Sequence, residues 1–289
     1  ESILEIAEKY GPDNLIIDVA QDDAIASGIA NLFKLKHYNV FGPTREAGKI
    51  ESSKIWARQF MARHGIPSSG WHFDDPERAK ANLQYQYTAS NQEAVFFVKA
   101  DGLAMGKGAI RVENISEAYD AIDRMSSFGE SGKKFLVEEG MDGEEFSCYA
   151  IVDKNGNFHV FKSAQDNKRV FDGDQGPNTG GMGAISPAMV TRGSENEIES
   201  EMIAKAIRGL GKEGRPFVGV LYLGGIKTKN GLKVIEYNAR WGDPEIQVVG
   251  PGILNDYVDV VNACITGSLD KLIMEEDNKT RVCIVGASR

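Results

Sequence analysis

The sequence predicts an α/β protein of the α+β kind, in which a short doubly wound opening precedes a larger region of paired antiparallel strands. Over about the first 45 residues, short apolar runs typical of buried strands alternate with helical spacing. Two Asn-Gly pairs, Asn155-Gly156 and Asn230-Gly231, separate strand-like runs and are strong hairpin signals. A chain of 289 residues also exceeds the usual size of one domain, so we expect two or three packed units.

Local signals set the elements of the first 65 residues. Gly11-Pro12 closes the first helical pattern, and Gly42-Pro43 stops an apolar run that begins a strand. Gly65 is the expected C-terminal stop of a long helix. The predicted order is helix 1–10, strand 15–19, helix 22–36, a strand beginning at 40–41 and helix 46–63.

Longer strands dominate from about residue 66. Asn114 is placed to cap a helix that runs to about residue 125. Residues 142–145 predict a polar turn, and residues 165–183 predict a long polar loop because they show no apolar periodicity. The other predicted elements are strands 94–101, 109–113, 135–140, 146–153, 157–163, 217–228 and 232–238, a helix over 195–212, and helices over most of the remainder.

The composition disfavours several functional classes. With 42% hydrophobic and 26% charged residues the chain is globular, and its net charge of −9 argues against nucleic-acid binding through bulk electrostatics. No apolar run approaches the ~20 residues that cross a bilayer, and no signal-peptide pattern begins the chain. The cysteines Cys148, Cys264 and Cys283 lie far apart in apolar stretches and predict buried reduced thiols, so we expect a cytoplasmic protein.

A glycine-rich loop follows an apolar strand. Lys99 comes after an unbroken apolar run, so its ammonium must reach a partner at the strand end. Gly102, Gly106 and Gly108 allow close backbone approach and Lys107 adds charge, which suits a phosphate chain. The spacing is one residue short of a P-loop, and Gly108 replaces its Ser or Thr. The alternative is an ordinary hairpin with a lysine at its edge.

Glu236 and Asn238 alternate on a predicted strand and therefore point to one face, with Ile235 and Tyr237 on the other. Two oxygen-bearing side chains about 6–7 Å apart at Cα can converge on one hard cation. A solvent-facing stripe would explain the same pattern. Residues 240–245, directly beyond the strand, add a cation and further carboxylates.

Two further polar segments complete the candidate site. Residues 165–183 mix both signs of charge with several glycines, and loops of this length are usually functional or disordered. Residues 138–145 place acidic side chains around a turn, where backbone groups could read an adenine edge and a carboxylate could bind ribose. The alternatives are a mobile surface loop and a solvated strand connection.

In this order the motifs resemble those of the ATP-grasp superfamily, and more closely those of the phosphoribosylamine–glycine ligase family. PNTGGMG and NARWGDPE are more specific to this ligase than to ATP-grasp enzymes at large. Asn167 stands where the family usually has histidine, and Trp241 where it has phenylalanine. The resemblance covers most of the chain, and its blocks are residues 50–54, VKADGLAMGKG, VEEGMDGEEFS, QDNKR to TGGMG, GVLYLGG and VIEYNARWGDPE.

The resemblance implies an ATP-grasp fold with a partial N-terminal doubly wound unit. The implied domains are a partial N-terminal domain over 1–45, an ATP-grasp domain over 46–270 and the start of a truncated C-terminal domain over 271–289. A smaller nucleotide-clamping subdomain is implied at about 66–140. The family begins with a glycine-rich fingerprint upstream of the point where this sequence starts, and it continues past the point where the sequence stops.

The resemblance also implies the ligands and a role for each candidate residue. The ligands would be ATP and Mg²⁺ or Mn²⁺. The phosphates would be held by Lys54 and Lys99 under the loop Gly106, Lys107 and Gly108, the nucleoside by Glu138, Glu139 and Glu145, and the metal by Glu236 and Asn238. The substrate space would be lined by Asp166, Thr179, Gly180 and Gly181 together with the catalytic residues Lys168, Arg169, Arg240 and Asp243.

The implied reaction is ligation of glycine to 5-phosphoribosylamine through glycyl phosphate, which gives glycinamide ribonucleotide, ADP and phosphate in purine biosynthesis. A carboxylate is a poor acyl donor, and phosphorylation supplies a leaving group while cations neutralise the transferring phosphoryl group. The alternatives are another ATP-grasp carboxylate–amine ligase and an ATP-binding module without turnover. We expect small-molecule substrates, no nucleic-acid or membrane partner, and a monomer or weak homodimer.

Overall fold

The N-terminal part of the chain is a two-stranded parallel sheet with short helices around it. The computed structural model describes residues 3–72, 75–90, 94–102, 108–173 and 175–287. β1 (Ile16–Asp18) pairs in parallel with β2 (Asn39–Phe41), as a doubly wound opening requires. The helices of this part are α1 (Ile3–Tyr10), α2 (Asp22–Ser27) and α3 (Ile29–Leu35).

The single helix predicted over 22–36 is wrong, because Gly28 divides it. Gly28 has a φ of 85°, in the left-handed region that favours glycine. Its N–H reaches back to the carbonyls of Ala24 and Ile25, which ends α2 before α3 begins.

The helix predicted over 46–63 is also two helices, α4 (Lys49–Ser52) and α5 (Lys54–Arg63). Ser53 between them is extended, and its hydroxyl accepts a hydrogen bond from the N–H of Trp56, which caps α5. The same hydroxyl lies 3.1 Å from a carboxylate oxygen of Asp101, which also accepts from the N–H of Ile55 at 2.8 Å. The break therefore docks the start of α5, with Lys54, against the end of the strand that carries Lys99.

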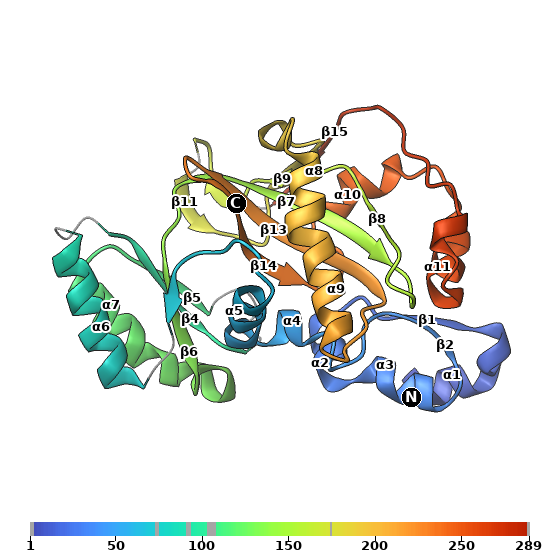
Figure 1. Ribbon diagram of the computed structural model, residues 1–289, viewed down its shortest axis with the longest axis horizontal. Helices are drawn as coiled ribbons and strands as arrows, with labels where there is room; N and C mark the ends of the chain where they lie inside the picture. The colour runs from blue at the N-terminus through green and yellow to red at the C-terminus, as the bar shows by residue number, and fades with distance from the viewer. Residues whose placement is uncertain (1–2, 73–74, 91–93, 103–107, 174, 288–289) are drawn as a thin grey trace.

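A small antiparallel sheet lies to the left in Figure 1, with two helices on one face. The strand order is β3 (Trp71–His72), β6 (Phe135–Glu139), β4 (Phe96–Ala100) and β5 (Ala109–Val112). The covering helices are α6 (Pro76–Ala89) and α7 (Ile115–Arg124), and their buried side chains form one core with the sheet. Asn114 caps α7 as predicted, since its side chain accepts from the N–H of Glu117 at 3.0 Å.

A longer antiparallel sheet forms the centre of the molecule. Its order is β14 (Gly231–Asn238), β13 (Gly219–Thr228), β7 (Gly143–Val152) and β8 (Phe158–Val160). Both predicted Asn-Gly hairpins are confirmed, between β7 and β8 and between β13 and β14. The polar turn predicted over 142–145 is wrong from residue 143 onward, because β7 starts there and pairs with the far end of β13.

One continuous helical segment covers this sheet, close to the prediction of a helix over 195–212 (Figure 1). Apolar side chains of the segment and of the sheet share the largest core of the molecule. Its parts are α8 (Glu195–Glu197), the π-helical turn η4 (Ile198–Ile203) and α9 (Ala204–Lys212). The remaining short helical turns are η1 (Pro12–Asn14), η2 (Met125–Gly132), η3 (Met189–Thr191), η5 (Gly250–Gly252) and η6 (Leu269–Lys271).

The long loop predicted over 165–183 instead contains short strands. β10 (Arg169–Phe171) and β11 (Gln175–Asn178) form a hairpin, and β9 (Gln165–Asp166) pairs with β12 (Gly183–Ser186). β12 also pairs with β15 (Arg281–Ile284), a strand in a region predicted to be mostly helical. β9, β10, β11 and β12 are too short for an apolar alternation to stand out in the sequence. The apolar run 282–284 of β15 was a strand signal that the prediction of helices missed. The helices found in this region are α10 (Ile246–Val249) and α11 (Tyr257–Thr266).

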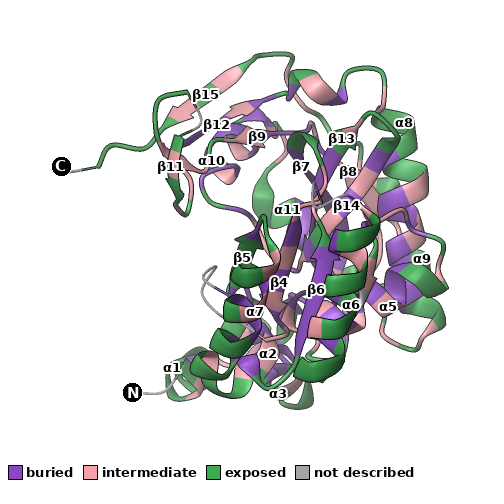
Figure 2. Cartoon of the chain, turned by 90° about the vertical axis from the view of Figure 1, so that its left-hand side faces the viewer, coloured by how far each residue is buried: buried purple, intermediate pink, exposed green. Residues whose placement is uncertain are grey.

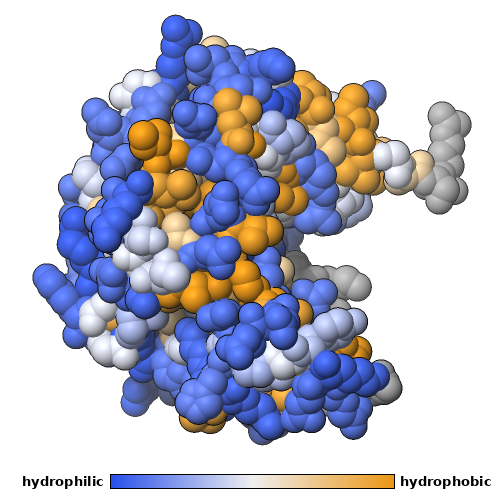
Figure 3. Space-filling view, turned by 90° about the vertical axis from the view of Figure 1, so that its right-hand side faces the viewer, coloured by the Kyte–Doolittle hydropathy of each residue, from blue (hydrophilic) through white to orange (hydrophobic). Residues whose placement is uncertain are grey.

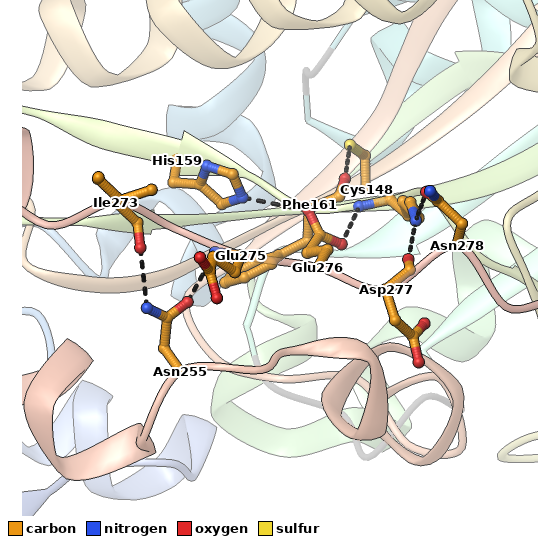
Figure 4. A network of polar contacts seen from close by, with 10 residues as sticks. Cys148, His159, Phe161, Asn255, Ile273, Glu275, Glu276, Asp277 and Asn278 are labelled. Atoms are coloured by element: carbon orange, nitrogen blue, oxygen red, sulfur yellow. Dashed lines mark hydrogen bonds and ion pairs between the residues drawn. The ribbon is translucent and has the colours of Figure 1, made fainter.

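Polar side chains anchor the segment that leads to β15 (Figure 4). Asn255 donates to the carbonyl of Ile273 at 2.9 Å and accepts from the N–H of Glu275 at 2.7 Å. The carboxylate of Glu276 accepts from the backbone N–H of Lys162 and lies 3.2 Å from the ring of His159. These contacts fix the chain against β8 and the segment that follows it.

Burial follows the two larger sheets. In Figure 2 the buried residues run along the strands of both sheets, whereas the outer helix faces are exposed. The face in Figure 3 is largely hydrophilic, with separate apolar patches. All three cysteine thiols are free, but only Cys148 and Cys264 are buried, so the prediction of full burial is wrong for Cys283 on the edge strand β15. Within the described residues, we find no helix with the length and apolar content to cross a lipid bilayer.

Candidate active site

A cavity of about 450 Å³ lies between the small sheet and the central sheet. α4 and α5 contribute one part of its lining, and β4, β6 and β14 contribute the walls. Lys99 and Glu236, predicted to act on one ligand, share this cavity although they are far apart in sequence. The predicted site residues that line it are Lys54, Lys99, Gly108, Glu138, Glu139, Glu145, Lys168, Thr179, Gly180, Glu236, Asn238 and Arg240.

Four predicted residues do not line this cavity. Arg169 donates to the carbonyl of Gly176 at 2.6 Å within the β10–β11 hairpin, and Asp243 accepts from the side chain of Gln247 at 2.7 Å. Gly181 packs against Pro244 so closely that a Cβ would lie 2.3 Å from its Cδ. Asp166 lies next to the cavity, 3.9 Å from the ammonium of Lys168. The predicted loop residues Gly106 and Lys107 lie outside the described residues.

The wall formed by the small sheet carries a buried carboxylate between two cations. Lys99 Nζ lies 2.5 Å from Glu138 Oε2, and Arg58 Nε donates to Glu138 Oε1. Burial favours a raised pKa for Glu138, but Lys99 and Arg58 outweigh it and lower the pKa to about 2. Glu138 is therefore ionised at neutral pH and held by cations, while the neighbouring Glu139 is exposed.

The wall formed by the central sheet presents the predicted metal ligands. The pairing of β13 with β14 is irregular at this point, because Ile235 of β14 is an extra residue between Val234, opposite Gly225, and Glu236, opposite Gly224. Asn238 lines the same cavity, whereas the hydroxyl of Tyr237 donates in the opposite direction, to the carbonyl of Met202. Among the described residues, the side chains of Glu236 and Asn238 have no hydrogen-bond or ion-pair partner.

Lys168 sits among carboxylates at the edge of the cavity. Its ammonium lies 3.0 Å from Glu145, which was predicted to bind ribose. Burial favours a lower pKa for Lys168, but Glu145, Tyr222, Asp166 and Glu236 together raise it. Burial also raises the pKa of Asp166, against the opposing charge of Lys168. Lys168 therefore stays positively charged in the cavity.

Sequence reasoning missed Glu51, although it belongs to the block that contributes Lys54. Glu51 is buried, lies 3.3 Å from Arg240 Nε and accepts from the N–H of Ala239 at 2.9 Å. Burial raises its pKa to about 7, although Arg240 and the Ala239 amide oppose the shift. Glu51 thus fixes the chain that carries Arg240 just beyond β14.

Arg58 was missed as well, and no local signal could have found it. An arginine in an amphipathic helix normally points to solvent, yet Arg58 is only 3% exposed. The carbonyls that it contacts belong to β14, more than 170 residues away. Only the tertiary fold places it in the cavity.

The two antiparallel sheets enclose a cavity that has lysines on one wall and a Glu/Asn pair on the other. This arrangement defines an ATP-grasp protein. A sequence model described as phosphoribosylglycinamide synthetase, ATP-grasp (A) domain, matches residues 52–246. The chain therefore belongs to the phosphoribosylglycinamide synthetase family, also named phosphoribosylamine–glycine ligase. The resemblance found in the sequence is confirmed for both the fold and the family.

The relatives agree with this assignment. The chain is 40% identical to phosphoribosylamine–glycine ligase of Streptococcus pyogenes serotype M3 and 41% identical to that of Streptococcus pneumoniae serotype 4. These matches cover 93% and 94% of this chain but 63% and 64% of the relatives. The chain thus spans somewhat less than two thirds of the length of these curated relatives.

Solved structures give the same fold. The crystal structure of phosphoribosylamine–glycine ligase from Thermotoga maritima matches with a TM-score of 0.73 at 32% identity, over 85% of this chain and 61% of that one. Biotin carboxylase from Campylobacter jejuni matches with a TM-score of 0.74 at 19% identity, over 97% and 60%. The second similarity concerns the fold alone.

Proposed function

We propose that this chain ligates glycine to 5-phosphoribosylamine at the expense of ATP, with glycyl phosphate as intermediate and glycinamide ribonucleotide, ADP and phosphate as products. Family membership supports this function. The observation that carries it is the shared cavity, in which Lys54 and Lys99 face the same space as Glu236 and Asn238. We place the reaction in purine biosynthesis and the protein in the cytoplasm.

Glu236 and Asn238 fit a divalent cation such as Mg²⁺ or Mn²⁺. Each offers an oxygen ligand to the cavity. Among the described residues, no group of three His, Cys, Asp or Glu residues is suited to a metal. Mg²⁺ commonly takes one or two protein ligands and completes its shell with phosphates and water. The cation would neutralise charge on the nucleotide phosphates when bound.

The side chains of the cavity suit phosphorylation of a carboxylate. Lys54 and Lys99 would hold the ATP phosphates, and Glu139 with the neighbouring backbone of β6 would contact the nucleoside. Lys168 and Arg240 would oppose the negative charge that develops during transfer of the γ-phosphoryl group. Glu51 would keep Arg240 in place. The amine of phosphoribosylamine would then attack the acyl carbon and release phosphate.

The other predicted roles remain part of this proposal. Asp166, Arg169, Thr179, Gly180, Gly181 and Asp243 would contribute to the binding of glycine and the ribosyl phosphate, and Gly106–Gly108 to that of ATP. We also keep the predicted domains, 1–45, 46–270 with a subdomain at about 66–140, and 271–289. The parallel sheet β1–β2 falls in the first, and the small sheet falls in the subdomain.

Phosphate release from ATP and Mg²⁺ tests this function, with glycine and freshly generated phosphoribosylamine each omitted in turn. Release that requires both substrates is the expected result. Release that needs a different acid or amine would identify another ATP-grasp ligase. ATP binding without release in any mixture would identify a nucleotide-binding module.

A further inference from the structure

Arg58 connects the two walls of the nucleotide cavity. It lies in α5, which packs against both β6 and β14 (Figure 1). Its Nε donates to Glu138 on β6, its Nη1 donates to the carbonyl of Val234 at 3.2 Å, and its Nη2 donates to the carbonyl of Ile235. The planar guanidinium thus joins the strand of Glu138 to the strand that carries Glu236.

The same contacts set the charge beside Lys99. Glu138 is 3% exposed and gives one oxygen to Arg58 and the other to Lys99, so the three side chains together carry one net positive charge. Without Arg58, Lys99 and Glu138 would form a neutral pair. Because the group is largely shielded from water, this difference of one charge acts strongly on a nearby anion.

We propose that Arg58 is a positioning residue of the nucleotide site, which neutralises Glu138 and so leaves the charge of Lys99 available to the phosphates of the nucleotide. The inference rests on the proposed function, because it takes the cavity as the ATP site. It adds a residue that acts through Glu138 and Lys99. Two features support it. Arg58 donates hydrogen bonds to Glu138 and to two backbone carbonyls. Within the described contacts, Arg58 and Lys99 are the only cations that contact Glu138.

A purely structural role predicts something different. If Arg58 only tied β6 to β14, its loss would distort the whole cavity and weaken ADP and adenosine alike. If it sets the charge beside Lys99, its loss would weaken ADP and spare adenosine, which has no phosphates. The ratio of ADP affinity to adenosine affinity therefore separates the two roles.

The experiment measures binding of ADP with Mg²⁺ and of adenosine by calorimetric titration, for the whole chain and four variants. Arg58→Met should lower the ADP-to-adenosine ratio about tenfold, because one unit charge near the phosphates is lost. Glu138→Gln added to Arg58→Met should restore most of that ratio, because Lys99 is then no longer neutralised. Arg58→Lys should keep the ratio within about threefold of wild type while lowering the unfolding temperature.

Arg63→Met is the matched control, since Arg63 lies on the same helix, pairs with Glu213 and does not line the cavity. It should leave the ratio unchanged. If Arg58→Met does not fold, Arg58→Lys and the double variant carry the test, and a tenfold loss in either would overturn the inference. An equal loss of ADP and adenosine affinity in Arg58→Met, or no rescue by Glu138→Gln, would also overturn it. A wild-type chain that binds neither ligand would overturn the proposed function as well.

Discussion

One group of the candidate site, Glu138 with Lys99 and Arg58, carries charges that are largely shielded from water. Glu138 keeps its charge away from water because two cations hold it, and its pKa of about 2 lies below the ordinary 4.5. A depressed carboxylate pKa adds stability that is fully present above the unfolded pKa and is lost as the pH falls toward the folded one. The pH window in which this contribution disappears is therefore 4.5 to 2.

Glu138→Gln tests this linkage, because glutamine keeps the shape of the side chain and cannot titrate. The cost of the substitution to the free energy of unfolding should be largest above pH 4.5. It should shrink by on the order of 3 kcal/mol by pH 2, as wild-type Glu138 becomes protonated. Urea unfolding of both proteins across this range measures the difference. A cost that stays constant with pH would show that the group does not titrate as stated.

Glu236, the proposed metal ligand, makes few structural contacts. It is exposed at the end of β14, and no described side chain pairs with it. Glu236→Gln should lower phosphate release at limiting Mg²⁺ by at least about tenfold, while the free energy of unfolding changes by less than about 0.5 kcal/mol. The control is Glu144→Gln, which removes an exposed carboxylate that does not line the cavity. Full activity of Glu236→Gln at limiting Mg²⁺ would refute the metal assignment.

At the scale of elements, Gly28 decides where α2 ends and α3 begins. Gly28→Ala should destabilise the fold by about 1 kcal/mol, because alanine is strained at a φ of 85° and its Cβ would lie 3.0 Å from Arg45. Gly211→Ala should stabilise it by about 0.5–1 kcal/mol, because Gly211 lies in α9 with open space around it. Thermal unfolding of both variants measures whether each substitution stabilises or destabilises the fold. Destabilisation by Gly211→Ala equal to that by Gly28→Ala would contradict this account of the helix break.

Strong local signals made most elements predictable. The Asn-Gly turns, the Asn114 cap and the apolar runs of β4, β6, β7 and β13 identify hairpins, a helix start and strands without tertiary information. The breaks at Gly28 and Ser53 fall inside continuous helical patterns, and the break at Ser53 also depends on contacts with the distant Asp101. β12 and β15 pair across about 100 residues, and no local pattern reports such a pairing.

The candidate site also contains residues that the sequence identifies and residues that only the fold reveals. Lys54, Lys99, Glu236 and Asn238 belong to motifs that the sequence displays, and the fold brings them to one cavity. Glu51 and Arg58 act through contacts with distant backbone and charged groups, so their roles appear only in three dimensions. The hairpin β10–β11 likewise directs Arg169 to its own backbone and not to the cavity.

At the scale of the whole molecule, the net negative charge of the chain opposes the binding of an anionic nucleotide. The chain carries −9, and the described lining of the cavity is close to neutral. The cations of that lining are Lys54, Arg58, Lys99, Lys168 and Arg240, and its carboxylates are Asp22, Glu51, Glu138, Glu139, Glu145 and Glu236. Such a balance leaves most of the charge of ATP uncompensated, so a divalent cation should be required for tight binding.

Titration of a non-hydrolysable ATP analogue tests most directly whether Lys99 and the Glu236–Asn238 pair serve one nucleotide. Wild-type protein should bind the analogue at least about tenfold more tightly with Mg²⁺ than with EDTA, and Lys99→Ala should lose at least about tenfold in the presence of Mg²⁺. Lys80→Ala, which removes a lysine paired with Asp123 away from the cavity, should bind like wild type. Equal affinity of Lys99→Ala and wild type, or binding that does not respond to Mg²⁺, would contradict the account.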